Sequence, residues 1–447
     1  MPYEFYEKDL VRFLINTSQA QIDELIEDIH PADILDAIHA YEGDKLLLFQ
    51  KLPEWVIAAI IDYAEDEEKY ELLSIFPEKR QKDIVEEMSS DELVDLLGSI
   101  PKEQADDIIV KLDLEEAEEV RELLTYKPDT AGGIMATEFI CVQDTMSVGS
   151  TLKYLQQEAP DAETAYYIYV LGEDDHLKGV VSLRDIVVSN FDVKIGDIMN
   201  ENVISIPVDM DQEEVGHIFE KYSFLTMPVV NDKDEMLGIV TVDDIMAVLS
   251  DEHTEDMYRL AGLQEGEKVT GTIGESVKSR LPWLFVNLVT AMLAAATVSL
   301  FEDTISKVVA LATFMPIVAG MGGNAGTQTL TLIVRGIALG ELTFENAKKV
   351  LVKEFGVGIS NGFAIGLAVA TLGYFWERKP IFGLVIGLAM FLNLIAATTA
   401  GFLVPVTLKR FKIDPALASA VFVTTVTDVL GFFFFLGLAT LFITHLI

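Results

Sequence analysis

The sequence predicts a multidomain membrane protein: an N-terminal all-α solenoid, an α/β tandem pair, a connecting helix and a five-helix α transmembrane domain. Three observations predict this fold class: an uneven charge distribution, five long apolar stretches and two internal repeats. Only 8 of the 72 acidic and 10 of the 32 basic residues lie in 281–447, so the formal charge of −40 belongs to the first 280 residues. A uniform soluble protein is therefore excluded. We expect no nucleic acid among the partners, because phosphate neutralisation needs clustered Lys and Arg.

The apolar stretches define the transmembrane domain, which is predicted to cover 281–447. Each stretch reaches the length of ~20 residues that a helix needs to cross a bilayer core. They run over Trp283–Phe301, Val308–Val334, Phe355–Trp376, Ile381–Leu408 and Ala416–Leu446. The loops on one side of these spans carry nine Lys and Arg residues, which predicts that this side is cytoplasmic. We expect a multi-pass protein of the cell (inner) membrane, in contact with lipid, with a cytoplasmic N-terminus and an extracytoplasmic C-terminus.

A loose repeat in 1–128 predicts the solenoid. The dipeptides His30-Pro31, Leu52-Pro53, Phe76-Pro77 and Ile100-Pro101 recur every 22 to 24 residues, and a helical apolar pattern follows each of them. Proline is accepted in the first turn of a helix. Fixed periods of 20–50 residues are typical of stacked helical pairs. Such a unit normally offers a binding surface rather than a catalytic pocket.

A second duplication lies in 129–250. The run Leu177–Ile186 matches Met236–Ile245, and each copy reads as strand, acidic turn, strand and helix. This pattern resembles a tandem CBS pair, also called a Bateman unit. The resemblance implies a unit that dimerises and binds ATP or another adenine nucleotide, whereas a cleft without ligand is the alternative. The candidate nucleotide-binding residues are Arg184, Asp185, Phe224 and Tyr167.

The segment 251–280 is predicted to be an acidic helix and linker that connects the tandem pair to the membrane. Asp244, Asp251 and Glu255 fall on one stripe of this helix, which begins near Asp243. A solvated helix face is the simpler interpretation, and a lever between domain and membrane is the functional one. Asp91 and Asp95 form an i, i+4 pair on the solenoid. The candidate cytosolic cation-sensing residues are Asp91, Asp95, Asp243, Asp244, Asp251 and Glu255.

Asp428 is the one carboxylate that hydropathy places at the centre of a span. Threonines surround it, Thr424 among them, and the spans offer it no Lys or Arg and no His except His445 at the very end of the last span. Burying a charge at this depth costs about 2.5–3.5 kcal/mol even on the gentler insertion scale, so such residues are functional candidates. A cation site and a proton site both fit the residue. A protonated Asp that hydrogen-bonds two helices is the structural alternative.

The run Pro316–Thr329 is the second polar feature of the membrane half. Its glycines are expected to let backbones approach and to expose carbonyl oxygens, and Asn324 adds an amide oxygen. Such neutral oxygens, together with a carboxylate, suit hard cations such as Mg²⁺. Helix packing is the alternative explanation for the glycines. The predicted metal ligands within the membrane are therefore Asp428, Asn324 and Thr424.

Several runs in the membrane half resemble the MgtE family of Mg²⁺ transporters. They are Arg280–Leu284, Gly323–Gln328, Arg335–Glu341, Lys409–Ala416 and Thr424–Asp428. The order of solenoid, CBS pair and connecting helix also resembles that family. The resemblance implies a homodimeric, Mg²⁺-selective channel that imports Mg²⁺ down its electrochemical gradient. It further implies a pore on the dimer axis faced by Asp428, and a gate that closes when cytosolic Mg²⁺ binds the acidic domains.

Other classes of function fit less well. A proton-coupled divalent cation carrier with Asp428 as its proton site stays the alternative. We do not expect an enzyme, because no His-Glu-x-x-His motif, nucleophile–base pair or Walker loop occurs. The single cysteine, Cys141, leaves no intrachain disulfide to form.

Overall fold

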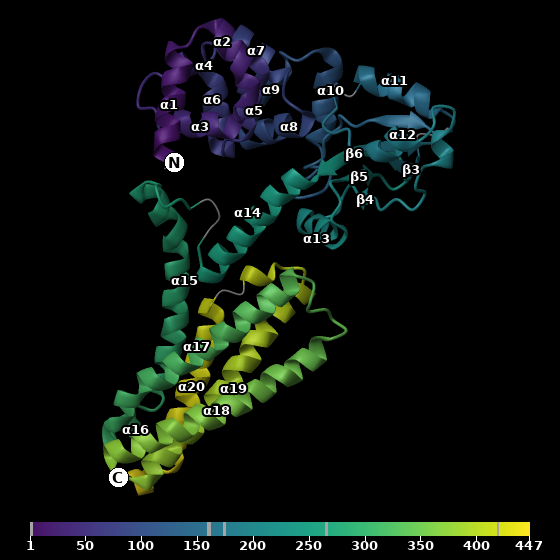
Figure 1. Ribbon diagram of the computed structural model, residues 1–447. Coiled ribbons are helices and arrows are strands. Elements are labelled where there is room, and N and C mark those ends of the chain that lie inside the picture. The colour runs from purple at the N-terminus through teal and green to yellow at the C-terminus, as the bar shows by residue number, and fades with distance from the viewer. Residues whose placement is uncertain (1–2, 159–161, 173–175, 264–266, 418–419) are drawn as a thin grey trace. The chain divides into compact units, whose positions relative to one another are not determined.

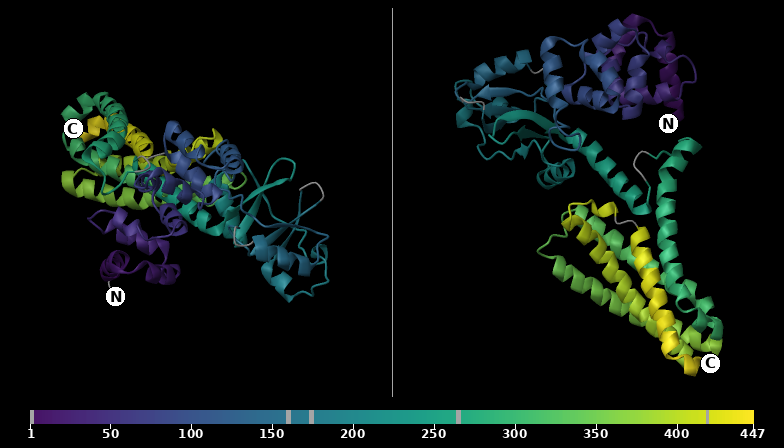
Figure 2. Two further views of the ribbon diagram at one scale, coloured as in Figure 1. Left: turned by 90° about the horizontal axis from the view of Figure 1, so that it is seen from above. Right: turned by 180° about the vertical axis from the view of Figure 1, so that it is seen from behind.

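The computed structural model describes residues 3–158, 162–172, 176–263, 267–417 and 420–447. The chain divides into two compact units, Met1–Leu249 and Ser250–Ile447, and each is treated by itself. Figures 1 and 2 show the elements of both.

The described elements have the following bounds. The first unit holds the helices α1 Tyr3–Asn16, α2 Gln19–Leu25, η1 Ile26–Asp28, α3 Pro31–His39, α4 Leu46–Phe49, α5 Glu54–Asp62, α6 Asp66–Ser74, α7 Glu78–Val85, α8 Ser90–Ser99, α9 Lys102–Ile109 and α10 Leu114–Leu123. It continues with β1 Cys141–Gln143, α11 Val148–Glu158, β2 Tyr167–Leu171, β3 Leu177–Ser182, α12 Leu183–Val188, η3 Ile195–Asp197, β4 Ile206–Pro207, α13 Gln212–Tyr222, β5 Thr226–Val230, β6 Met236–Thr241 and α14 Val242–Ala261, which enters the second unit. The second unit then holds α15 Ile273–Ser299, α16 Glu302–Lys307, α17 Ala310–Ala338, α18 Ala347–Glu377, α19 Pro380–Arg410, η4 Pro415–Leu417, α20 Ala420–Leu441 and α21 Ile443–Leu446.

The repeated prolines of the N-terminal segment start alternate helices. Pro31 is the first residue of α3, and Pro53, Pro77 and Pro101 immediately precede α5, α7 and α9. A proline fits these places because its fixed φ suits a helix start and its missing N–H has no partner there. Helices α3, α5 and α7 pack in succession, and α6, α8 and α10 do the same. The predicted helical N-terminal domain is confirmed.

The duplicated segment folds into two small α/β units of the same topology. The sheets have the orders β1-β2-β3 and β4-β5-β6, with a parallel first pair and an antiparallel second pair in each. The two copies are joined by a hydrogen bond of 2.9 Å between the Tyr169 hydroxyl and Thr226 Oγ1, both buried. The core of the N-terminal helices continues into the second copy, so the first unit packs as one body.

The acidic helix that follows the second copy ends before the membrane half begins. Helix α14 stops at Ala261, and Gly262 adopts a left-handed conformation with φ of 75°. Glycine is the usual residue at this point because a Cβ would be strained there. Helix α15 begins only at Ile273, where Thr272 and Glu275 form a capping box. The connecting helix and the first long helix of the second unit are therefore separate elements.

The second unit is a bundle of long helices. Among the described residues, α15, α18, α19 and α20 are long and apolar enough to cross a membrane. Helix α17 covers the second predicted stretch with 29 residues, but its Asn, Thr, Gln and Gly residues make it less apolar. In the described part of the chain, five helices are therefore of membrane length, as predicted, and four of them are also apolar enough to cross a membrane.

Glycines bring α18 and α19 into close contact along their length (Figure 1). A Cβ atom on Gly366 of α18 would lie 2.8 Å from the carbonyl oxygen of Gly387 on α19, which is shorter than real contacts allow. Small residues at such contacts are typical of helices packed within a membrane.

Candidate functional site

Asp428 lies in the third turn of α20 and is half-buried. Thr424 precedes it by four residues, so both side chains lie on the same face of the helix. Thr424 Oγ1 donates to the Val421 carbonyl at 3.1 Å, which leaves lone pairs on the hydroxyl oxygen. Within the described part of the chain, the Asp428 carboxylate makes no hydrogen bond or ion pair. A cation or a proton would therefore satisfy it.

Helix α17 packs directly against this part of α20. A Cβ on Gly323 would lie 3.3 Å from Thr424 Cγ2, and a Cβ on Gly326 would lie 2.6 Å from Val423 Cγ1. Asn324 follows Gly323 and is exposed in the single chain. The structure therefore brings the turn of α17 that carries Asn324 next to the turn of α20 that carries Thr424. This juxtaposition could not be read from hydropathy.

Three glycines of α17, Gly322, Gly323 and Gly326, lie against neighbouring helices and serve packing. Helix α17 is unbroken from Ala310 to Ala338, so the carbonyl oxygens of its glycines accept the ordinary bonds of an α-helix. The expectation that these glycines expose carbonyl oxygens as ligands is therefore wrong for this structure. The polar candidates on α17 are side chains, of which Asn324 and Gln328 are exposed.

Glu354 is a second carboxylate of the membrane half, and sequence reasoning missed it. It lies on α18 with only 3% of its surface exposed. Thr329 Oγ1 of α17 donates to its Oε2 at 3.4 Å, and Lys353 Nζ lies 2.9 Å from its Oε1. The expectation that Asp428 is the only deep ionisable residue is thus wrong. It failed because the third apolar stretch was started at Phe355, one residue after Glu354.

Asp91 and Asp244, two of the predicted sensing residues, lie in one acidic cluster of the first unit with Asp62 and Glu92. Burial raises the pKa of Glu92 to about 9, with further contributions from Asp62 and Asp91. Asp62 shares a hydrogen bond with Glu92, and burial raises its pKa as well. Burial and the nearby Asp91 raise the pKa of Asp244 to about 7. One Asp91 oxygen is buried without a hydrogen-bond partner in the described residues.

Of the remaining predicted sensing residues, Asp243 lies near this cluster and contributes to the raised pKa values of Asp62 and Asp244. Asp95, Asp243 and Asp251 are exposed. Glu255 of α14 forms an ion pair with Arg259, and Arg259 also pairs with Asp414.

Asp256, beside this group, has a pKa raised to about 6 by burial and by Asp414. Across the residues that the structure describes, no three His, Cys, Asp or Glu side chains converge closely enough to hold a metal ion.

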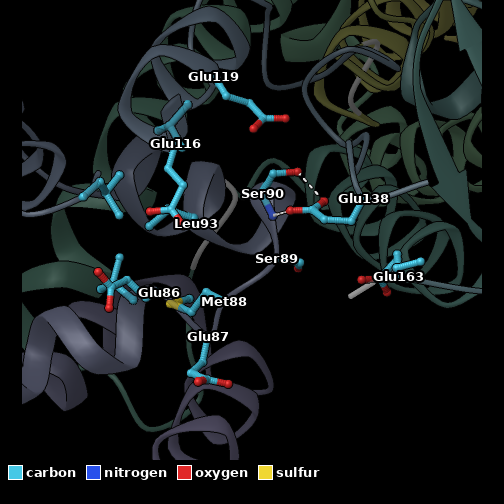
Figure 3. Close-up of a pocket in the computed structure, with 14 residues that line it drawn as sticks. Glu86, Glu87, Met88, Ser89, Ser90, Leu93, Glu116, Glu119, Glu138 and Glu163 are labelled. Atoms are coloured by element: carbon cyan, nitrogen blue, oxygen red, sulfur yellow. Dashed lines mark hydrogen bonds between the residues drawn. The ribbon is translucent and has the colours of Figure 1, made fainter. Parts of the chain in front are cut away.

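The first unit also contains a cavity of about 570 Å³ that is lined by acidic side chains. Ser90 donates from its backbone N and from Oγ to the Glu138 carboxylate, at 2.9 and 2.8 Å (Figure 3). Burial raises the pKa of Glu138 above its usual range and that of Glu163 to about 7. The acidic residues that line the cavity are Glu86, Glu87, Glu116, Glu119, Glu138 and Glu163, and no Lys, Arg or His is among its described lining residues. Sequence reasoning missed these glutamates because it considered only carboxylates spaced along one helix.

Three of the candidate nucleotide-binding residues, Tyr167, Arg184 and Asp185, lie in the first CBS copy, and Phe224 lies in the second. Arg184 and Asp185 occupy the first turn of α12, where Ser182 Oγ donates to Asp185 at 2.6 Å. Tyr167 begins β2. Phe224 precedes β5, and its ring stacks on Tyr222 with 5.6 Å between centroids. No ring contact joins Tyr167 to Phe224 in the described residues.

Protein-family models match the N-terminal helical domain, both CBS copies and most of the helical bundle. The model of the MgtE divalent cation transporter domain matches 315–438, and that of the MgtE intracellular N domain matches 29–129. The CBS domain model matches 131–189 and 195–251.

Named relatives cover most of the chain. The magnesium transporter MgtE of Thermus thermophilus is 35% identical over 424 residues, 94% of this chain and 94% of that protein. The magnesium transporter MgtE of Enterococcus faecalis is 38% identical over 333 residues, 74% of this chain and 73% of its own.

Two solved structures resemble the first part of the chain. The soluble part of a magnesium transporter is 37% identical with a TM-score of 0.53, and covers 56% of this chain and 99% of its own. The cytosolic domain of the Mg²⁺ channel MgtE in complex with ATP is 36% identical with a TM-score of 0.51, and covers 54% and 99%. With 35% identity over 94% of its length to one such transporter, the protein belongs to the MgtE family of magnesium transporters.

Proposed function

We propose that the chain forms a homodimeric, Mg²⁺-selective channel whose pore site is built around Asp428. The observation that carries the proposal is the half-buried Asp428 carboxylate, without a protein partner among the described residues, on a helix that packs against the turn carrying Asn324. Mg²⁺ gives up its water reluctantly and is usually held by one or two carboxylates and several waters. One Asp428 from each protomer supplies those carboxylates, while Asn324 and Thr424 contact the waters of the ion.

A hydrated site of this kind suits conduction. A channel must bind its ion strongly enough to admit it and weakly enough to release it. Contacts made through water hold Mg²⁺ less tightly than a complete cage of carboxylates. The two Asp428 carboxylates, one from each protomer, still repel anions from the pore. The ion then moves down its electrochemical gradient into the cell.

Uptake of Mg²⁺ by proteoliposomes tests the pore site. The Asp428→Asn variant keeps the shape of the side chain and removes its charge. Because a hydrogen bond to a charged group contributes about 1.5–3 kcal/mol, we expect uptake to fall at least about tenfold. Asp303→Asn, which neutralises an exposed carboxylate of α16, is the matched control. Wild-type uptake by Asp428→Asn would refute the site, and uptake that requires a proton gradient would favour the proton-coupled carrier.

We further propose that cytosolic Mg²⁺ closes this channel by binding the acidic groups of the first unit and of α14. Burial is the largest cause of the raised pKa values of Glu92 and Asp244, and the neighbouring carboxylates Asp62 and Asp91 raise both values further. Mg²⁺ that binds between such groups relieves their repulsion. It acts as a ligand of the compact state, and shifts the gate by its difference in affinity for the two states.

The gating proposal is tested by neutralising four predicted sensing residues together. The variant changes Asp91, Asp95 and Asp251 to Asn and Glu255 to Gln, and its uptake should be less inhibited by Mg²⁺ on the cytosolic side. A control variant neutralises exposed acidic residues of α9, such as Asp106 and Asp107. Trypsin digestion with EDTA or with Mg²⁺ reports compaction of wild type. The proposal is contradicted if trypsin digests wild type equally in EDTA and in Mg²⁺, and if cytosolic Mg²⁺ inhibits uptake by the variant as strongly as uptake by wild type.

We also propose that the CBS pair binds an adenine nucleotide. A related cytosolic domain has been crystallised with ATP. In this chain Arg184 and Asp185 stand at the start of α12 for the ribose and phosphates, and Phe224 and Tyr167 offer rings for the base. Calorimetry of the full chain with ATP should give heat that Phe224→Ala reduces, and no heat at millimolar ATP rejects the site.

A further inference from the structure

Asn393 is a fully buried amide at the middle of α19, with none of its surface exposed. Its Nδ2 donates to the Val318 carbonyl of α17 at 2.9 Å. Its Oδ1 is buried and has no hydrogen-bond partner in the described residues. Such an unpaired group carries a desolvation cost that an apolar side chain would avoid. An amide at this position therefore needs a reason other than stability.

Two glycines on two other helices make room for this amide. Gly322 of α17 faces it so closely that a Cβ on Gly322 would collide with Nδ2. Gly431 of α20 faces it from another side, where a Cβ would lie 2.7 Å from Nδ2 and 3.1 Å from Oδ1. The Asn393 side chain thus fills the space where α17, α19 and α20 meet.

The contact is next to the candidate ion site on both helices. Gly322 is two residues from Asn324 on α17, and Gly431 is three residues from Asp428 on α20. Val423, Thr427 and Gly431 form a buried stripe of α20, and Asp428 is the next residue after Thr427. A larger or smaller side chain at position 393 therefore changes the distance of α20, and with it of Asp428, from α17.

We propose that Asn393 is a positioning residue that sets the separation of α17 and α20, and with it the width of the ion site. This inference rests on the proposed pore at Asp428. The hydrogen bond to Val318 fixes the amide against α17, while the Gly431 backbone rests on the amide face. The side chain acts as a spacer of defined size, and the selectivity among Mg²⁺, Mn²⁺, Co²⁺ and Ni²⁺ depends on that size.

Cross-linking measures the separation without any transport. The chain has a single cysteine, Cys141, which is first changed to Ser. Cysteines then replace Gly323 and Thr424, whose side-chain positions are near enough for a disulfide, since a Cβ on Gly323 lies 3.3 Å from Thr424 Cγ2. Loss of free thiols in the full-length protein in liposomes gives the rate of disulfide formation.

The variants of Asn393 predict opposite changes in that rate. Asn393→Leu is bulkier and lacks the bond to Val318, so it forces α17 and α20 apart and slows cross-linking. Asn393→Ala lets the helices approach and speeds it. Adding Gly431→Ala to Asn393→Ala refills the space and returns the rate toward that of the parent. Asn361→Ala, an exposed amide on α18, is the matched control.

Transport then tests the selectivity. In the chain with native Gly323 and Thr424, both single variants of Asn393 should lower the preference for Mg²⁺ over Mn²⁺ two- to tenfold, the factor that corresponds to one hydrogen bond. Cross-linking rates and preferences equal to those of Asn361→Ala overturn the inference.

The Asp428→Asn variant distinguishes a failure of the spacer inference from a failure of the proposed pore function. If that variant conducts normally, the pore proposal fails while the cross-linking rates still decide whether Asn393 spaces the helices. Because the Ala variant leaves more room and the Leu variant less, a folding failure of one leaves the other to decide.

Discussion

Replacement of Glu92 by Gln should flatten the pH dependence of the stability of the first unit. In the folded chain the pKa of Glu92 is about 9, raised by burial and by Asp62 and Asp91, against an ordinary value of 4.5. Between these values the folded state holds a proton that the unfolded state has lost. A carboxyl whose folded pKa is raised contributes stability that is complete below the unfolded pKa and is lost as pH rises toward the folded pKa.

The size of the effect follows from linkage. One proton corresponds to about 1.4 kcal/mol per pH unit, so wild type should lose about 2.7 kcal/mol more than Glu92→Gln between pH 6 and pH 8. For a unit of this length, 1 kcal/mol shifts the melting temperature by about 2–4 °C, so the difference is roughly 5–11 °C. Gln keeps the capping box that Glu92 forms with Ser89, so the substitution removes the titratable proton while it preserves the helix cap.

The assay must report the first unit alone. Trp55 lies in α5 of that unit, and Trp283 and Trp376 are changed to Phe so that Trp55 gives the fluorescence signal. Melting is followed in EDTA at pH 6, 7 and 8 for this background, for Glu92→Gln and for Glu103→Gln, an exposed control on α9. Parallel melting curves for the background and for Glu92→Gln would refute the reasoning.

Three further predictions concern single contacts. Tyr169→Phe leaves the buried Thr226 hydroxyl without its bond, so the first unit should lose about 1–3 kcal/mol in chemical denaturation; an unchanged midpoint contradicts this. Gly366→Ala places a Cβ 2.8 Å from the Gly387 carbonyl oxygen and should lower the thermal stability of the membrane half by about 1–3 kcal/mol, which a melt in detergent would show. Glu354→Gln removes a charge buried within the bundle, and because such residues are usually functional, uptake by proteoliposomes should fall at least about threefold with no loss of melting temperature; wild-type uptake would make Glu354 a packing residue.

The sequence by itself determined the order of the parts and much of their local structure. Prolines at a spacing of 22 to 24 residues mark helix starts because a proline tolerates few other places in a helix. The duplicated run with Ser182 and Asp185 predicts strand followed by helix, since Ser182 caps the helix that Asp185 stabilises. Hydropathy found Asp428 because a charge among apolar residues is visible along the chain. Each of these signals depends only on residues that are near one another in the sequence, so it can be recognised without the tertiary structure.

The tertiary structure alone decided which polar groups are buried together. Glu354 looks like the charged end of a span, and becomes a buried carboxylate only because α17 brings Thr329 against it. Glu92 and Asp62 are thirty residues apart, and their shared hydrogen bond depends on how α5 and α8 pack. Asn393 is one apolar-span asparagine among several until Gly322 and Gly431 close on it from two other helices. Burial and pairing are properties of contacts between distant segments, so periodicity within one segment does not contain them.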